Sequence, residues 1–160
     1  MKTQNVIQYQ RNCHRFHYEG DSHFLTFSCY ERKPALRDDQ IKRIVGTAIA
    51  DTCSYLSVDL WAYVIMPEHV HLLIHPRLPD FKTEHFLVRA KRKTTNARNK
   101  KFPDNKSPLW LAGGGYDRNI FSADELQEKL RYIHLNPVRK GISSGESEYV
   151  WSCAPTMSFF

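Results

Sequence analysis

The sequence lacks long apolar runs, closely spaced cysteines and an apolar N-terminus. No run approaches the roughly 18 apolar residues of a membrane-spanning helix, so we expect no membrane span. The four cysteines lie far apart without a CxxC pair, which argues against a zinc knuckle or a disulfide framework and favours reduced thiols in the cytoplasm. The first twelve residues are polar, and we therefore expect no signal peptide.

Internal repeats and linkers between regions of different composition are also absent from the sequence. Its 160 residues suit one domain, and 41% of them are hydrophobic, which is enough for a packed core. We expect a single domain over residues 1–160, with an N-terminal arm at 1–20 and a C-terminal tail at 142–160. The sequence has 17 Asp and Glu residues but 23 Lys and Arg residues, which gives a net charge of +6. This balance favours an anionic partner, nucleic acid before an acidic membrane.

The excess positive charge lies in one segment, from Lys82 to Lys106. This segment holds nine basic and two acidic residues, whereas the rest of the chain carries a net charge of −1. Its middle, KRKTTNARNKK, mixes cations with Thr and Asn, which also hydrogen-bond phosphate oxygens. A solubilising helix face would show a similar charge, but we favour a surface that contacts phosphates. The predicted DNA contacts in this segment are Arg89, Lys91, Arg92, Lys93, Arg98, Lys100 and Lys101.

Hydrophobic periodicity and turn residues predict three strands, three helices and a stretch of short extended pieces. The predicted strands are 22–29, 58–66 and 69–75, the helices are 38–56, 81–100 and 122–141, and the extended pieces lie at 108–121. We expect Pro137 to interrupt or kink the last helix and Gly141 to end it. This order of elements suits an α+β fold in which the helices pack on one face of a central antiparallel sheet.

Three histidines alternate along the predicted strand at 69–75. Because successive side chains point to opposite faces, His69, His71 and His75 share one face, and the apolar residues between them face the helices. Same-face neighbours lie about 7 Å apart, so His69 and His71 can converge on one metal ion, whereas His75, roughly 20 Å from His69, cannot join them. Surface or hydrogen-bonded histidines are the alternative. A metal site also needs a third ligand from elsewhere in the chain.

A tyrosine lies on the last predicted helix, away from the buried stripe of that helix. Tyr132 and Asn136 are four residues apart and share a helix face. A half-buried packing role is the simplest interpretation of such a tyrosine. Together with the histidine pair and the basic segment, however, a presented phenol indicates phosphodiester cleavage by a tyrosine nucleophile. A phenol with an ordinary pKa of about 10 is a poor nucleophile at neutral pH, so this chemistry needs a Lewis acid on the scissile phosphate.

Several motifs in one order resemble the REP-associated tyrosine transposases. They are MPEHVHLLI at 66–74, GGGYDRNI at 113–120 and YIHLNPVRKG at 132–141, with HRFHYEGDSHFLTFS near the N-terminus. That group belongs to the HUH single-tyrosine transposases and is related to the small insertion-sequence transposases. The resemblance spans roughly residues 24–151, which is most of the chain.

The resemblance implies a fold, a metal site and a reaction. It implies a ferredoxin- or RRM-like sheet with the histidines on a central strand and the tyrosine on a helix alongside. His69 and His71 would be ligands of a divalent metal, Mg²⁺ or Mn²⁺, with Asn136 as the third ligand. Tyr132 would be the nucleophile that forms a covalent 5′-phosphotyrosine link and releases a 3′-hydroxyl.

The resemblance also implies the partners. The substrate would be single-stranded DNA next to an imperfect hairpin, typically a repetitive extragenic palindrome, and the protein would be associated with the nucleoid. Arg11, Arg15 and the stretch from Tyr116 to Arg118 are further candidates for hairpin recognition, and we count Arg118 among the predicted DNA contacts. Relatives act as monomers or as homodimers, and the sequence leaves both open.

Two other functions compete with a DNA-nicking and rejoining transposase. One is a domesticated protein that binds DNA hairpins without catalytic turnover. The other is a metal-dependent hydrolase of small phosphoesters, which would need neither the basic segment nor a presented tyrosine. Formation of a covalent DNA adduct would separate the transposase from both.

Overall fold

The structure of the chain is a computed structural model that describes residues 21–153. The predicted arm at 1–20, with Arg11 and Arg15, lies outside the described residues. Within 21–153, no helix is both long enough and apolar enough to cross a membrane. The elements are β1 (Ser22–Ser28), η1 (Tyr30–Arg32), α2 (Asp39–Leu56), β2 (Val58–Ile65), β3 (His69–Pro76), α3 (Thr83–Lys101), β4 (Tyr116–Ile120), α4 (Ala123–Arg139) and β5 (Ser152–Cys153).

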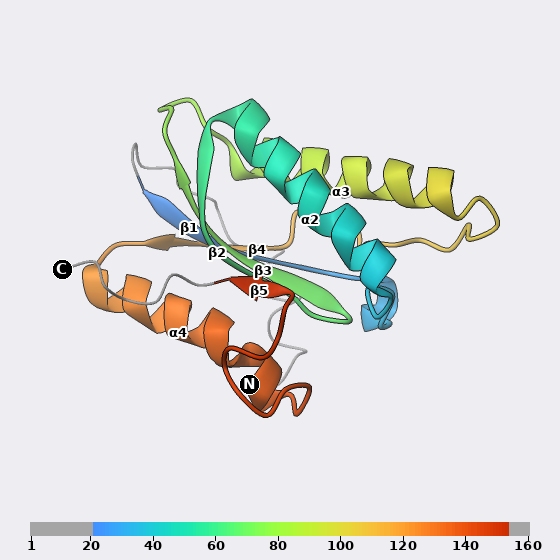
Figure 1. The fold of residues 1–160 in the computed structure, drawn as a ribbon. Helices are drawn as coiled ribbons and strands as arrows, with labels where there is room; N and C mark the ends of the chain where they lie inside the picture. The colour runs from blue at the N-terminus through green and yellow to red at the C-terminus, as the bar shows by residue number, and fades with distance from the viewer. Residues whose placement is uncertain (1–20, 154–160) are drawn as a thin grey trace.

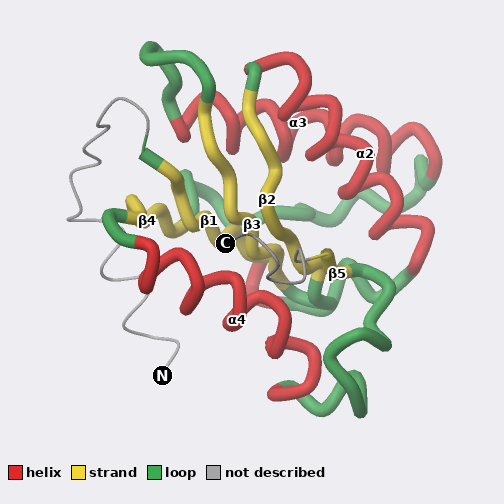
Figure 2. The backbone as a smooth tube through the Cα atoms, turned by 60° about the vertical axis from the view of Figure 1, so that its left-hand side comes forward, coloured by secondary structure: helices red, strands yellow, loops and turns green. Residues whose placement is uncertain are grey.

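The five strands form one sheet with the order β4-β1-β3-β2-β5, and all neighbouring strands are antiparallel. β3 is therefore central, between β1 and β2 (Figure 2). The register places Thr26 of β1 and Val64 of β2 on either side of His71. A strand in this position has both edges hydrogen-bonded, so its side chains are held by neighbours on both sides.

The sheet is covered on both faces. α2 and α3 lie on one face and α4 lies on the other (Figure 1). Val70, Leu72 and Ile74 of β3 are fully buried in the core that α2 and α3 complete. A second core lies under α4, where Ile133 packs with Phe24. Two layers of helix therefore enclose the sheet, as in many α+β domains.

The predicted α+β class with an antiparallel sheet is confirmed, but the prediction that the helices pack on one face is wrong for α4. The second face of the sheet is itself apolar, because Phe24, Val64 and Leu73 all point toward α4 and are buried there. The apolar stripe of α4 covers these side chains and removes them from water.

Two of the described helices begin at a capping side chain. Asp38 begins α2 by accepting hydrogen bonds from the backbone of Gln40 and Ile41. Ser122 begins α4 by accepting one from the N–H of Glu125. Pro137 does not interrupt α4, which continues to Arg139, because the proline lies in the last turn, where it removes only one hydrogen bond of the helix.

Gly115 allows the chain to enter β4 close against β1. Its φ of +83° is in the left-handed region, and a Cβ at this position would lie 2.5 Å from the carbonyl oxygen of Thr26. Only glycine fits both the conformation and the space. The backbone of β1 at Thr26 therefore depends on a residue that carries no side chain.

The predicted C-terminal tail contributes to the sheet. β5 pairs with the outer edge of β2, where Ser152 lies opposite Val64. The hydroxyl of Tyr149 donates a hydrogen bond of 2.7 Å to the carbonyl of Ile65, and the indole of Trp151 donates one of 3.0 Å to Asp39. The aromatic residues near this end therefore anchor it to β2 and α2.

Substitution of Leu72 by alanine is expected to lower the free energy of unfolding by about 2–5 kcal/mol, because Leu72 is fully buried and its truncation leaves a cavity. Urea denaturation followed by circular dichroism measures the change. The matched control is Leu78→Ala, since that side chain is 50% exposed, and it should change the value by less than about 0.5 kcal/mol. Equal effects of the two substitutions would contradict the assignment of β3 to the centre of the core.

Candidate active site around His69 and His71

β3 brings two histidines together on the face of the sheet that α4 covers. Their ring centroids lie 4.5 Å apart with an interplanar angle of 70°. Both residues are buried, with 3% of His69 and 5% of His71 exposed. The predicted convergence of these two imidazoles is therefore present in the geometry, and they are not surface histidines.

Each imidazole is oriented through its Nδ1 atom. Nδ1 of His69 lies 3.1 Å from a carboxylate oxygen of Glu68, and Nδ1 of His71 lies 2.7 Å from the hydroxyl oxygen of Thr26. Since the Nδ1 atoms are engaged, Nε2 is the nitrogen of each ring that is left for a metal ion or a substrate. Hydrogen bonds of this kind fix the orientation of metal-binding histidines and raise the basicity of the ligand nitrogen.

Burial keeps the His71 ring neutral. The pKa of His71 lies well below its ordinary value, chiefly because burial penalises the charged form and also because of positive charge at His69, Arg32 and Lys140. The pKa of Glu68 is lowered by its hydrogen bond with His69, so the carboxylate stays ionised. A neutral imidazole has a lone pair on Nε2, as a metal ligand requires.

α4 places Tyr132 beside the histidines of the same chain. The ring centroid of Tyr132 lies 5.2 Å from that of His71 and 5.8 Å from that of Phe24. The guanidinium carbon of Arg139 lies 5.6 Å from the Tyr132 ring centroid. Tyr132 is only half-buried, so the phenol lies at the border between the core under α4 and solvent. A single chain thus brings together the imidazoles and the phenol.

Asn136, the third residue of the predicted ligand set, lies one turn after Tyr132 on α4. It is 4% exposed, and its Oδ1 atom is buried without a hydrogen-bond partner. Nε2 of His71 is buried and without a partner in the same way. Such unsatisfied polar atoms are rare in folded proteins and call for an explanation such as an ion. Imidazole nitrogen and amide oxygen are both metal ligands, so these residues fit a divalent metal.

The other candidate ligands do not join this site. His75 lies at the other end of β3, where it contacts the hydroxyl of Ser22 and stacks on Trp61. Within residues 21–153, no three His, Cys, Asp or Glu side chains gather closely enough to hold a metal ion. Among these residues, a third protein ligand for the His69 and His71 pair would have to be of another residue type, and the buried amide oxygen of Asn136 is a candidate.

The basic segment lies on the opposite face of the sheet, on α3 (Figure 1). Arg98 is buried and donates a hydrogen bond to the carbonyl of Ser107, and Arg89 stacks on the ring of Tyr55 at 3.5 Å. Five of the eight predicted DNA contacts have such partners within the protein: Arg89, Lys91, Lys93, Arg98 and Arg118. The remaining three, Arg92, Lys100 and Lys101, are exposed. The structure therefore does not bring the basic segment to the histidines.

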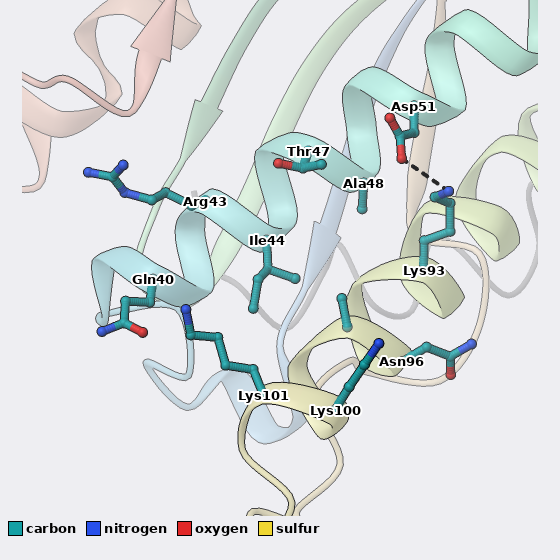
Figure 3. Close-up of a pocket in the computed structure, with 11 residues that line it drawn as sticks. Gln40, Arg43, Ile44, Thr47, Ala48, Asp51, Lys93, Asn96, Lys100 and Lys101 are labelled. Carbon is teal, nitrogen blue, oxygen red and sulfur yellow. Dashed lines mark ion pairs between the residues drawn. The ribbon is translucent and has the colours of Figure 1, made fainter.

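A groove of about 530 Å³ separates α2 from α3 (Figure 3). Ile44, Ala48 and Ala97 line it, and the charged residues around it are Arg43, Asp51, Lys93, Lys100 and Lys101. Lys93 forms an ion pair of 3.1 Å with Asp51 across the groove. Cations from two helices thus face one groove, and one of these cations is already neutralised by a carboxylate.

Two residues that hold the histidines are not recognisable from the sequence. Glu68 has the pattern of an ordinary turn residue because it precedes the strand, and nothing local shows that its carboxylate folds back onto His69. Thr26 lies on the first predicted strand, but its contact with His71 depends on the register between β1 and β3. A predicted register of this pair would have found Thr26.

The fold is similar to that of solved transposase structures. A REP-associated tyrosine transposase bound to a REP hairpin superposes with a TM-score of 0.73 at 20% sequence identity, over 88% of this chain and 81% of that chain. A protein of Deinococcus radiodurans R1 assigned as a transposase gives a TM-score of 0.54 at 18% identity, over 78% of this chain and 95% of that one. At these identities the similarity shows the fold alone.

Sequence comparison identifies the family. No curated protein matches the chain. The family of IS200-like transposases, by contrast, matches residues 17–136, which include both histidines, Tyr132 and Asn136. Because this match covers most of the chain, the protein belongs to the IS200-like transposase family.

Proposed function

We propose that the protein nicks and rejoins single-stranded DNA through a covalent intermediate on Tyr132. The observation that carries this proposal is the position of the phenol, 5.2 Å between ring centroids from a buried, neutral His71. Asn136 follows on the same helix with an unpaired amide oxygen. Such an assembly of a nucleophile with atoms that can bind a metal is suited to phosphoryl transfer.

In the proposed reaction, the hydroxyl oxygen of Tyr132 attacks the phosphorus of a phosphodiester. A bond forms between the tyrosine oxygen and phosphorus, and the bond from phosphorus to the 3′-oxygen of the preceding nucleotide breaks. The phenol loses a proton and the released 3′-oxygen gains one. Attack of a 3′-hydroxyl on the phosphotyrosine reverses these changes and rejoins a strand, so the energy of the phosphodiester is conserved in the covalent link.

The proposed metal ligands are His69, His71 and Asn136, with Mg²⁺ or Mn²⁺ as the ion. When bound, a divalent metal polarises the phosphate and stabilises the charge that develops on its oxygens. The protein contributes the orientation of the ligands, since Glu68 and Thr26 hold the two rings. It also excludes water from the ligand atoms, because all three ligand residues are buried.

The proposed substrate is single-stranded DNA beside a hairpin. The solved relative is bound to a REP hairpin, which supports a hairpin partner for this chain. The net charge of +6 supports binding to phosphates. Exposed cations at Arg92, Lys100 and Lys101 offer a phosphate-contacting surface on the face of the sheet opposite Tyr132.

Tyr132→Phe is expected to abolish the covalent protein–DNA adduct, because phenylalanine keeps the ring but lacks the attacking oxygen. The assay mixes protein, Mn²⁺ and a labelled hairpin oligonucleotide with a single-stranded flank, and denaturing gel electrophoresis detects the adduct. Hairpin binding by the variant should remain within about twofold of the parent. If the parent protein forms no adduct with any member of a panel of hairpins, the result would favour a protein that binds DNA hairpins without catalytic turnover.

Asn136→Ala is expected to weaken Mn²⁺ binding at least about tenfold, because it removes the amide oxygen that has no partner within the protein. Titration of Mn²⁺ followed by electron paramagnetic resonance measures the affinity without any catalytic step. Asn96→Ala is the matched control, since that amide is exposed on α3 across the sheet, and it should leave the affinity unchanged. Equal affinities of the two variants would remove Asn136 from the ligand set.

Replacing Lys100 and Lys101 together by glutamine is expected to weaken DNA binding and reduce its salt dependence. Each lost phosphate contact lowers the slope of log K against log salt by about 0.9 for a duplex stem. Fluorescence anisotropy of a labelled hairpin over a range of NaCl concentrations gives the slope. An unchanged slope would show that the basic segment does not contact phosphates.

A further inference from the structure

We infer that Arg32 and Lys140 form an anion site beside the two histidines, which takes a phosphodiester group of the single strand at the reacting centre. This inference rests on the proposed function for the identity of the strand. Neither residue belongs to the predicted set of DNA contacts. That set lies almost entirely on α3, on the other face of the sheet.

The position of Arg32 follows from a hydrogen bond and a strand register. The guanidinium of Arg32 donates a hydrogen bond of 3.3 Å to the hydroxyl of Ser28. Ser28 lies directly opposite His69 in the pairing of β1 with β3. Directly opposed side chains on one face of a sheet have Cβ atoms about 5 Å apart. Ser28 shares the face of Thr26, which holds His71, so Arg32 reaches the edge of the histidine pair.

The backbone that presents Arg32 is in an unusual conformation. Glu31 and Arg32 have φ angles of 52° and 53°, and they are two of the three residues other than glycine with positive φ among those described. Side chains rarely adopt this left-handed region, and such strain persists where the surroundings enforce it, often at functional sites.

Hydrogen bonds to the turn between β2 and β3 enforce this conformation. The N–H of Cys29 donates to the carbonyl of Glu68 at 2.9 Å, and the N–H of Leu36 donates to the carbonyl of Pro67 at 2.9 Å. Both acceptors belong to the turn that directly precedes His69. These hydrogen bonds connect the segment that carries Arg32 to the segment that carries the proposed metal ligands His69 and His71.

The charge of Arg32 is not neutralised by a neighbouring acid among the described residues. Glu31, the adjacent acid, instead forms an ion pair of 2.6 Å with Lys33. Arg32 is half-buried, which strengthens its interaction with an anion relative to a fully exposed cation. A guanidinium also offers several donors in a planar fork that matches two oxygens of a phosphate.

Lys140 supplies a second cation from a different element. It follows the last residue of α4, and its N–H donates a hydrogen bond of 3.1 Å to the carbonyl of Asn136. Its positive charge acts on the buried ring of His71, as does that of Arg32, and also on the carboxylate of Glu68. Two cations that are far apart in the sequence thus act on the same buried histidine, an arrangement that favours a bound anion.

The test uses variants of the full chain that also carry Tyr132→Phe, so that binding is measured without chemistry. The probe is a fluorescein-labelled hairpin with a single-stranded 5′ flank, followed by anisotropy over a range of NaCl concentrations. Arg32→Gln and Lys140→Gln should each lower the salt slope by up to about 0.7, the value for one neutralised phosphate of a single strand. Arg32→Lys should keep the slope and weaken binding, because it retains the charge but loses the fork.

Arg77→Gln is the matched control. It removes one positive charge near the other end of β3, where Arg77 pairs with Asp59, and it should leave the slope unchanged. Mn²⁺ affinity should not fall in any of these variants, which separates a loss of phosphate binding from a disturbed metal site. Slopes for Arg32→Gln and Lys140→Gln equal to that of Arg77→Gln would overturn the inference.

Phosphates that contact the site can be located by replacing them one at a time with neutral methylphosphonates. The replacement that weakens binding of the parent should weaken binding of Arg32→Gln less, because part of the contact to that phosphate is already lost. Additive losses at every position would contradict the assignment. The binding measurements do not depend on the proposed reaction. If the salt slopes shift as expected but the parent protein forms no covalent adduct, the anion site is supported and the nicking chemistry is rejected.

Discussion

The alternation of side chains along β3 is the constraint on which the rest of the structure depends. As the central strand, β3 sends Val70, Leu72 and Ile74 into the core beneath α2 and α3. The same pleat sends His69 and His71 to the face under α4. A slip of one residue in its register would exchange the two sets, burying imidazoles in one core and exposing aliphatic side chains at the site. Stability of the fold and orientation of the site are therefore set by the same strand pairing, and neither can be changed alone.

The site holds two polar atoms without partners among the described residues. Nε2 of His71 and Oδ1 of Asn136 are buried and unpaired, and each such atom costs about 1–3 kcal/mol of stability. The apolar contacts of Phe24 and Ile133 around them offset this cost. Glu68 and Thr26 keep the two rings from turning toward other partners. The result is a preorganised set of ligand atoms, which loses little freedom when an ion or a phosphate arrives.

Local patterns predict much of this arrangement from the sequence, and the parts they miss depend on distant contacts. The period of two in HVHLLIH gives the face shared by His69 and His71, and the spacing of four gives the shared face of Tyr132 and Asn136, because both patterns depend only on the geometry of one element. The face of the sheet that α4 covers could not be predicted, since it depends on the path of the loops that connect α4 to the strands. Counting charges also overestimates the number of cations on α3 that are available to DNA. A count cannot show that Arg98 is buried against a carbonyl or that Arg89 is stacked on a tyrosine.

Gly115, the residue before β4, influences the site through the strand that it packs against. Gly115 makes room for the carbonyl of Thr26, and the hydroxyl of Thr26 holds the His71 ring. A methyl group at position 115 would push β1 away from its place, and the disturbance would reach an imidazole on the neighbouring strand through two contacts. Inactivating changes in this protein can therefore arise at positions that never touch DNA or metal, and a map of such changes would outline the support of the site as well as its reactive groups.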